Sequence, residues 1–423
     1  MQPSATQTVA PKPSQSSAVT LAAVRAAAAS IKGQVRRTPL IRGPRFPGLP
    51  DVELYLKLEN LQETGAFKLR GATNRIAQLT AEQAKRGVIA ASAGNHAQGV
   101  AVAARARGIP ATIVMAESAS PMKVSATRAL GAEVVLYGQD YEEAHEEATR
   151  RAAVGSLTYI HPFDDPFVIA GQGTVGLEIL EDLPDVRRVV VGVGGGGLLS
   201  GITVAIKSQR PEVEMVAVQP NGADTLRASL REGRVVVGSR PSTVADGLAT
   251  RHVGELPLKI LEHFGVTAVA VDDRTIARAS FLLLEQSKVL AEGAGAAPLA
   301  ALLEHPELAR DGPVVLVVSG GNIDPFVLDR ILWIGLAAEG RLLRLRASLR
   351  DAPGRLAEFL KVAADAHANV RSIVHDRESP DRPPGEVVVE LELEVRDRPH
   401  ADEVLGAYRA RGWPVEQVPI GAG

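Results

Sequence analysis

The stretch VVVGVGGGGLLSGI, from Val189 to Ile202, decides the fold prediction because an apolar strand runs through it into glycines and then into a helix. Four consecutive glycines, Gly194 to Gly197, form the turn. Glycine has no Cβ, so successive backbone N–H groups can point at one ligand, and the helix start adds positive potential. The turn has neither the Lys-Ser/Thr pair of a Walker loop nor the spacing of a dinucleotide-binding turn. We interpret it as a cup for one phosphomonoester; the alternative is a flexible linker.

Short apolar strands alternate with amphipathic helices on both sides of this cup. The strand-like runs include GVIAASA and ATIVMA before it and EMVAVQP and AVAVDD after it. Such alternation is typical of βαβ units around a parallel sheet. Two sets of units predict an α/β domain at residues 18–335, with two lobes and a cleft between them. The smaller lobe, about residues 55–150, is inserted in the larger one. Ligands of such folds bind at the carboxyl ends of the strands, where the glycine-rich turns fall.

The pattern changes after about Leu336. A strand, a turn, a helix and a second strand are followed by the long alternating segment GEVVVELELEVRD, another helix and a last strand. This βαββαβ order is the ferredoxin-like arrangement, with the loop ESPDRPPGE between its middle strands. We therefore expect a separate C-terminal domain at residues 340–420.

The bulk composition excludes several classes of function. The chain has 423 residues, enough for two or three domains, and its formal net charge is −2. This balance indicates neither nucleic acid nor a membrane surface as a partner. The absence of cysteine rules out disulfides, thiolate nucleophiles and cysteine-ligated metals. No apolar run is long enough to span a membrane, and residues 1–17 have the composition of a disordered tail rather than a secretory signal. We expect a cytoplasmic protein.

A single lysine, Lys68, lies among small and apolar residues in TGAFKLRGA, from Thr64 to Ala72. Burial in such surroundings lowers the pKa of an amine and so frees the neutral nucleophile that reacts with an aldehyde or ketone. The alternative is a lysine at a helix start that faces water.

Two further strand-to-helix turns carry polar side chains. In ASAGNHAQGVA, from Ala91 to Ala101, Ser92 and Asn95 with the local N–H groups can hold a carboxylate, unless they only cap the helix. In VVLVVSGGNID, the hydroxyl of Ser319 at the strand end can contact a ring nitrogen, unless this is an ordinary turn. A reactive lysine, a phosphate cup, an anion-holding loop and a strand-end serine together fit a phosphorylated aldehyde, and pyridoxal phosphate has this chemistry.

Five segments in order carry a family resemblance: ENLQETGAFKLRGA, SAGNHAQGVA, PFDDPFVIAGQGTVGLEIL, GGGGLLSGI and SGGNID. Over about residues 20–335 the chain resembles the threonine dehydratase (threonine ammonia-lyase) family. These are fold type II, tryptophan synthase β-like, pyridoxal-phosphate enzymes. The C-terminal part resembles a single ACT domain, a ligand-sensing module, with DAPG, Asp351 to Gly354, at the turn after its first strand.

The resemblance implies a role for each cofactor-site residue. Lys68 forms the Schiff base with the cofactor and later moves the substrate's α-proton. Phe67 packs beside the cofactor ring, Asn95 contacts its phenolic oxygen, and Ser319 hydrogen-bonds the pyridine nitrogen as a neutral partner that favours β-elimination. The phosphate is held by Gly194, Gly195, Gly196 and Gly197.

The resemblance also implies the reaction. L-Threonine loses its β-hydroxyl by β-elimination and yields 2-oxobutanoate and ammonia, and L-serine yields pyruvate by the same route. The substrate carboxylate is received by the loop of Ser92, Asn95 and His96, although a lone histidine here is more often structural than catalytic.

Four positions depart from related families. Serine racemases place a serine where this chain has Ala93, so racemisation is not expected. Gln219 and Thr225 stand where racemases have acidic metal ligands, so no metal is expected. Gly293 replaces the proline of isoleucine-biosynthetic enzymes, which favours the single-ACT or degradative branch and leaves isoleucine biosynthesis or threonine catabolism open.

Other functions remain alternatives. A serine-preferring dehydratase has the same motifs, whereas a threonine synthase-like lyase needs extra basic residues that form no cluster here. A non-catalytic amino-acid sensor is expected to lose Lys68 or the glycine cup, and both are intact.

The ACT resemblance implies a homo-oligomer, a dimer or tetramer, with isoleucine or valine as effector. The effector is expected near Asp351, Pro353, Gly354 and Asn369; the alternative is a domain that only dimerises.

Overall fold

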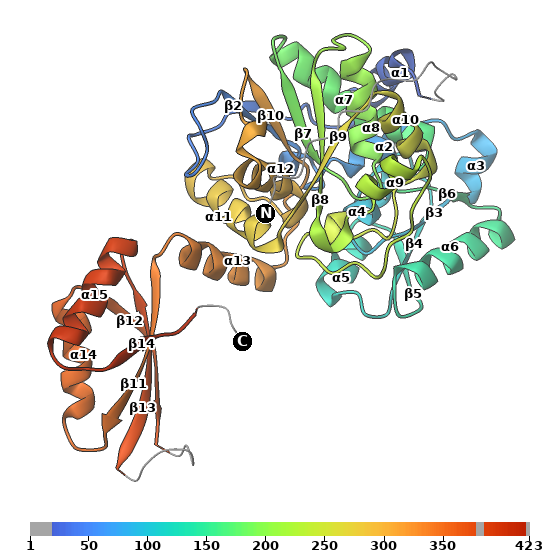
Figure 1. Cartoon of the computed structure of the whole chain (residues 1–423). Coiled ribbons are helices and arrows are strands. Elements are labelled where there is room, and N and C mark those ends of the chain that lie inside the picture. Colours follow the sequence, from blue (N-terminus) through green and yellow to red (C-terminus); the bar gives the residue numbers. More distant parts are fainter. Residues whose placement is uncertain (1–18, 378–384, 420–423) are drawn as a thin grey trace. The chain divides into compact units, whose positions relative to one another are not determined.

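The structure is a computed structural model that describes residues 19–377 and 385–419. It divides into two compact units, Met1–Asp324 and Pro325–Gly423, whose chain course is drawn in Figure 1. The division falls before helix α13 (Pro325–Ala338), most of which the sequence pattern places in the first domain. The tail predicted for residues 1–17 lies outside the described residues.

The larger sheet of the first unit has six strands in the order β1-β2-β10-β7-β8-β9. All neighbours are parallel except β1 and β2. The central strands β7 and β10 are buried along their whole length, as a valine-rich parallel strand requires. The bounds are β1 Leu40–Arg42, β2 Leu54–Leu58, β7 Arg188–Gly192, β8 Glu214–Pro220, β9 Thr267–Val271 and β10 Val314–Val318.

The smaller sheet has four parallel strands in the order β5-β4-β3-β6. Its strands are β3 Val88–Ala91, β4 Ala111–Met115, β5 Glu133–Leu136 and β6 Thr158–Tyr159. Each sheet has its own buried apolar clusters, which confirms the predicted α/β architecture of two lobes.

Helices cover both sheets. Helices α7 and α8 pack closely because glycines face each other: a Cβ on Gly201 would lie 2.3 Å from the carbonyl oxygen of Ile169. None of the helices within the described ranges is long and apolar enough to cross a membrane. The helix bounds in this unit are α1 Leu21–Ile31, α2 Lys68–Ala77, α3 Ala81–Arg86, α4 Asn95–Arg105, α5 Pro121–Ala129, α6 Tyr141–Gly155, α7 Pro166–Asp182, α8 Gly197–Lys207, α9 Leu226–Glu232, α10 Glu255–His263, α11 Asp273–Ser287 and α12 Gly293–Glu304.

The C-terminal unit confirms the ferredoxin-like arrangement. Its antiparallel sheet has the order β12-β13-β11-β14, and Phe359 and Tyr408 of the two helices belong to its core. Every residue of the edge strand β12 is exposed. The bounds are β11 Leu342–Arg350, α14 Arg355–Asp365, β12 Asn369–Asp376, β13 Glu386–Glu394, α15 Arg398–Ala410 and β14 Val415–Gln417.

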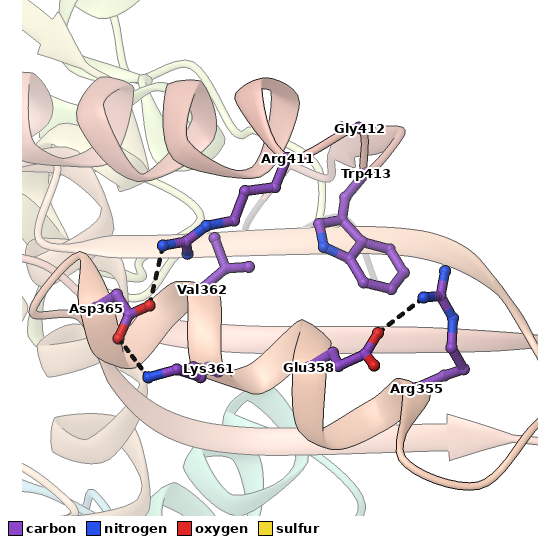
Figure 2. A pocket seen from close by; sticks show the side chains of 8 residues that line it. All are labelled: Arg355, Glu358, Lys361, Val362, Asp365, Arg411, Gly412 and Trp413. Atoms are coloured by element: carbon purple, nitrogen blue, oxygen red, sulfur yellow. Dashed lines mark hydrogen bonds and ion pairs between the residues drawn. The ribbon is translucent and has the colours of Figure 1, made fainter.

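An open pocket of about 360 Å³ lies between α14 and the turn after α15 (Figure 2). Its charged side chains are paired with one another: Arg355 with Glu358 at 2.7 Å, and Asp365 with both Lys361 and Arg411. The Arg355 guanidinium also lies 4.6 Å from the centre of a Trp413 ring. Each charged side chain of the pocket therefore has an oppositely charged partner in its lining, which includes none of the predicted effector residues.

Candidate active site

Lys68 is the first residue of α2, and its side chain is partly buried rather than directed fully into water. Its Nζ donates a hydrogen bond to the carbonyl oxygen of Pro162 at 2.8 Å and lies 5.1 Å from the centre of the Phe67 ring. Burial lowers the pKa of Lys68 to about 8, and the charge of Glu292 partly opposes that shift. A lysine with this pKa has a far larger neutral fraction near neutral pH than a solvated one.

The segment before Lys68 is attached to the end of strand β10. The Phe67 N–H donates to the Ser319 carbonyl at 3.1 Å, and Ala66 forms a bridge with Gly320. These contacts bring the predicted lysine and the predicted strand-end serine to one place, although they are far apart in sequence. Gly65 has φ +71°, and a Cβ there would lie 2.4 Å from Asn322 Oδ1, so only glycine fits this turn.

The four glycines line a buried turn between β7 and α8. Gly196 has φ +93°, and a Cβ on Gly195 would lie 2.2 Å from the Phe163 ring. The Gly195 carbonyl accepts from the Gly254 N–H at 3.0 Å, which fixes the turn against the loop before α10. This cradle lies at the amino end of a helix. The turn is packed too closely for a side chain at Gly195, and its backbone N–H groups fit a phosphate group.

The loop before α4 brings the Asn95 side chain into contact with Glu292, whereas the side chains of Ser92 and His96 bond to the backbone. Asn95 Nδ2 donates to Glu292 Oε1 at 2.7 Å, and the Ser92 hydroxyl accepts from the Gly94 N–H. The buried His96 ring lies 2.8 Å from the Ile160 carbonyl through Nε2, so Nε2 carries the proton. Burial, with the charge of Lys68, lowers the pKa of His96 to about 3, and the ring is neutral.

The site also contains two polar residues to which the sequence motifs gave no role, Glu292 and Asn322. Glu292 immediately precedes α12, and its main-chain N–H donates to the Gly320 carbonyl at 3.1 Å. Asn322 Nδ2 donates to Asn95 Oδ1 at 2.8 Å and to the Thr64 carbonyl at 2.7 Å. The available signal was one acidic residue in the otherwise small, apolar stretch AEGAGAAPL, and an asparagine directly after the SGG turn.

The Gln219 side chain is hydrogen-bonded to the backbone at the start of α9. The side-chain carbonyl of Gln219 accepts from the main-chain N–H groups of Thr225, at 3.0 Å, and Leu226, at 2.7 Å. Gln219 thus holds the start of α9 in place.

The predicted effector residues do not lie together within one chain. Asp351, Pro353 and Gly354 form the turn after β11, where Asp351 pairs with Arg377 at 2.5 Å. Asn369 begins β12 beside Glu394, at the other end of the sheet. Because β11 spans nine residues between those ends, roughly 25 Å separates them.

Comparisons with known proteins identify the family of this chain. The family model described as "Pyridoxal-phosphate dependent enzyme" matches residues 31–320. An L-threonine ammonia-lyase of Thermotoga maritima is 47% identical over 400 residues, which cover 95% of this chain and all of that protein. An L-threonine ammonia-lyase of Geobacter sulfurreducens is 44% identical over 386 residues, covering 91% of this chain and 96% of that one.

A solved structure is also similar to this chain in sequence and fold. The crystal structure of a threonine deaminase from T.th. is 40% identical, has a TM-score of 0.68, and covers 72% of this chain and 99% of that one. The matched segment contains the lysine, the glycine cup and the strand-end serine described above. The chain therefore belongs to the family of pyridoxal-phosphate-dependent enzymes.

Proposed function

We propose that this protein is an L-threonine ammonia-lyase that converts L-threonine to 2-oxobutanoate and ammonia by β-elimination and also acts on L-serine. The observation that carries the proposal is the partly buried Lys68 amine, of lowered pKa, which is hydrogen-bonded to the Pro162 carbonyl and follows a segment whose backbone is bonded to the residues after β10. The names of the two bacterial relatives support the choice of substrate.

Pyridoxal phosphate, when bound, supplies an aldehyde that reacts with amines and a ring that stabilises negative charge on the substrate's α-carbon. Its phosphate is assigned to the N–H groups of Gly194 to Gly197, its ring to Phe67, its phenolic oxygen to Asn95 and its ring nitrogen to the Ser319 hydroxyl. Lys68 supplies the reacting amine and takes the α-proton. The Pro162 carbonyl holds Lys68 Nζ in place by the 2.8 Å hydrogen bond.

The substrate carboxylate is assigned to the loop at the start of α4. Ser92 and Asn95 offer side chains there, and the helix start offers N–H groups. His96 contributes to this loop through its backbone only, because its ring is hydrogen-bonded to Ile160 in the core.

Release of 2-oxo acid from L-threonine and from L-serine by the purified protein with pyridoxal phosphate tests this function, beside Lys68→Ala. We expect product from the parent protein and none from the variant, with circular dichroism showing that the variant is folded. No product from the parent with either substrate would support a non-catalytic amino-acid sensor, and faster turnover of L-serine would support the serine-preferring dehydratase.

We further propose that the C-terminal unit is an ACT domain that binds isoleucine or valine between two copies of the chain. Its edge strand exposes Val370, Ile373 and Val374. If two β12 strands pair antiparallel, the Asn369 end of one sheet meets the Asp351–Gly354 end of the other. One chain thus supplies only part of the effector site, which supports a homo-oligomer, a dimer or tetramer. The cysteine-free sequence supports a reducing, cytoplasmic location.

Two measurements test the regulatory proposal. Light scattering gives the oligomeric state, which we expect to change when Ile373 is replaced by lysine in the edge strand. Threonine turnover with each amino acid added separately gives the effector. A rate of threonine turnover that no added amino acid changes would contradict the proposed regulation.

A further inference from the structure

Glu292 is an acidic residue in direct contact with the assigned cofactor site, and the roles proposed for that site do not involve it. Its carboxyl group packs against a backbone glycine: a Cβ on Gly320 would lie 2.3 Å from Oε1. The same oxygen accepts the hydrogen bond from Asn95 Nδ2 at 2.7 Å. The side chain therefore reaches from the start of α12 to the start of α4, beside the end of β10.

A chain of hydrogen bonds fixes which way the Asn95 amide points. Asn322 Nδ2 uses one hydrogen on the Thr64 carbonyl and the other on Asn95 Oδ1. An amide nitrogen has two hydrogens, so Asn95 Nδ2 donates one to Glu292 and keeps one for a ligand. Rotating the Asn95 amide by half a turn would place its nitrogen against the Asn322 nitrogen and its oxygen against the Glu292 oxygen. Asn322 and Glu292 together thus present Asn95 as a donor.

The charges around Glu292 come from several elements. Lys68 of α2 and Lys123 of α5 favour its ionised form, whereas Asp246, in the 3-10 turn Asp246–Leu248, opposes it. Burial outweighs these effects and raises the pKa of Glu292 to about 7. Its charge in turn raises the pKa of Lys68, so the two groups are linked.

We propose that Glu292 is a positioning residue: its carboxyl group holds Asn95 as a hydrogen-bond donor toward the cofactor. The inference rests on the proposed assignment of the cofactor to this site. The Glu292 side chain has two properties, a hydrogen-bond acceptor and a negative charge, and different substitutions remove them separately.

The experiment measures binding of pyridoxal phosphate to the cofactor-free protein by equilibrium dialysis, and the rate of cofactor capture from about pH 6 to about pH 9. Glu292→Gln keeps an acceptor oxygen and loses the charge. We expect its dissociation constant to stay within about threefold of the parent's, while the pH midpoint of capture moves downward. Glu292→Ala loses both, and its dissociation constant should rise about tenfold, the equivalent of one lost hydrogen bond.

A double-mutant cycle tests whether Glu292 acts through Asn95. Asn95→Ala alone should weaken cofactor binding, and adding Glu292→Ala to it should weaken binding no further. Glu304→Ala, at the other end of the same helix, is the matched control and should leave cofactor binding unchanged, because Glu304 accepts from the Asp272 N–H instead.

Additive losses in the cycle, or a Glu292→Gln variant that binds the cofactor about tenfold more weakly than the parent, overturn the proposal. The glutamine variant decides the matter even if the alanine variant fails to fold. A parent protein that binds no pyridoxal phosphate contradicts both this inference and the proposed function. A parent that binds it, with Glu292 variants identical to the parent, contradicts this inference alone.

Discussion

Lys68 Nζ donates its hydrogen bond to the carbonyl oxygen of Pro162, 94 positions further along the chain, at 2.8 Å. The next residue after Pro162 is Phe163, whose ring lies against the Cα of Gly195 in the glycine cup. One short loop before α7 therefore touches both the amine and the phosphate cradle. The spacing between these two parts of the site depends on this loop.

The lowered pKa of Lys68 sets the pH dependence of cofactor capture. Only the neutral amine reacts with an aldehyde, so the rate at which the cofactor-free protein captures pyridoxal phosphate should rise with pH to a midpoint near 8. A solvent-exposed lysine would place the midpoint near about 10. Stopped-flow absorbance across this pH range checks the prediction. A midpoint near that of free lysine would mean that burial does not tune this amine.

Alanine at Gly195 should damage the phosphate cup. The added Cβ would lie 2.2 Å from the Phe163 ring, so either the ring or the turn must move. We expect a loss of about 1–3 kcal/mol in the free energy of unfolding and at least roughly tenfold weaker binding of pyridoxal phosphate. Urea unfolding and equilibrium dialysis give the two values.

Gly406→Ala is the control for Gly195→Ala, because no atom outside its own helix lies within 4 Å of the added Cβ. It lies within α15, where alanine is the better helix former, so the free energy of unfolding should stay the same or rise slightly. Equal losses at both positions would contradict the packing argument.

His96 should make the protein sensitive to mild acid. Its folded-state pKa of about 3 is below its ordinary value of 6.5, so the unfolded state binds the proton first. The stability linked to the neutral ring is complete above pH about 6.5 and is lost as pH falls toward about 3, by at most about 1.4 kcal/mol per pH unit. Urea unfolding at several pH values gives the slope. In His96→Gln this slope should be smaller, and an unchanged slope would exclude His96 as its source.

Arg70 should contribute strongly to stability. It is fully buried on α2 and pairs with Glu59 at 2.8 Å and with Glu178 at 2.6 Å, and Lys57 also pairs with Glu178. Arg70→Met leaves the carboxylate of Glu59 buried without its cation, which should lower the free energy of unfolding by about 3–5 kcal/mol. Thermal and urea unfolding measure the loss.

The matched control is Arg37→Met. Arg37 also pairs with two acids, Glu181 and Asp182, but its side chain is half exposed. Its removal should cost less than about 1 kcal/mol. A similar cost at both positions would show that burial is not what distinguishes the two ion-pair networks.

Local sequence was sufficient to predict the backbone arrangement of the segments on which the proposed site is built. The glycine cup needs only a strand, four glycines and a helix start in succession, and the setting of Lys68 is also visible within a few residues. The quoted strand runs form strands in the structure for the same reason: their burial follows from their own composition.

Other parts of the site depend on contacts between distant segments. Glu292 meets Asn95 across 197 positions, and Asn322 meets it across 227, so neither neighbourhood reveals the contact. The proposed effector residues show the opposite difficulty. Asp351 and Asn369 are close in sequence, yet the helix between them carries the chain to the other end of the sheet.

Strand β10 lies between β2 and β7 in the large sheet, although it is the last of the six strands in the sequence. The residues directly after it also receive the segment that leads into Lys68, through the bridge between Ala66 and Gly320. During synthesis on the ribosome, the lysine therefore emerges long before the strand that positions it. Strands β2 and β7 therefore cannot take their places in one sheet until residues 314–318 have been made. A chain that ends before this point has Lys68 but lacks the Ser319 and Gly320 backbone that holds the residues before it.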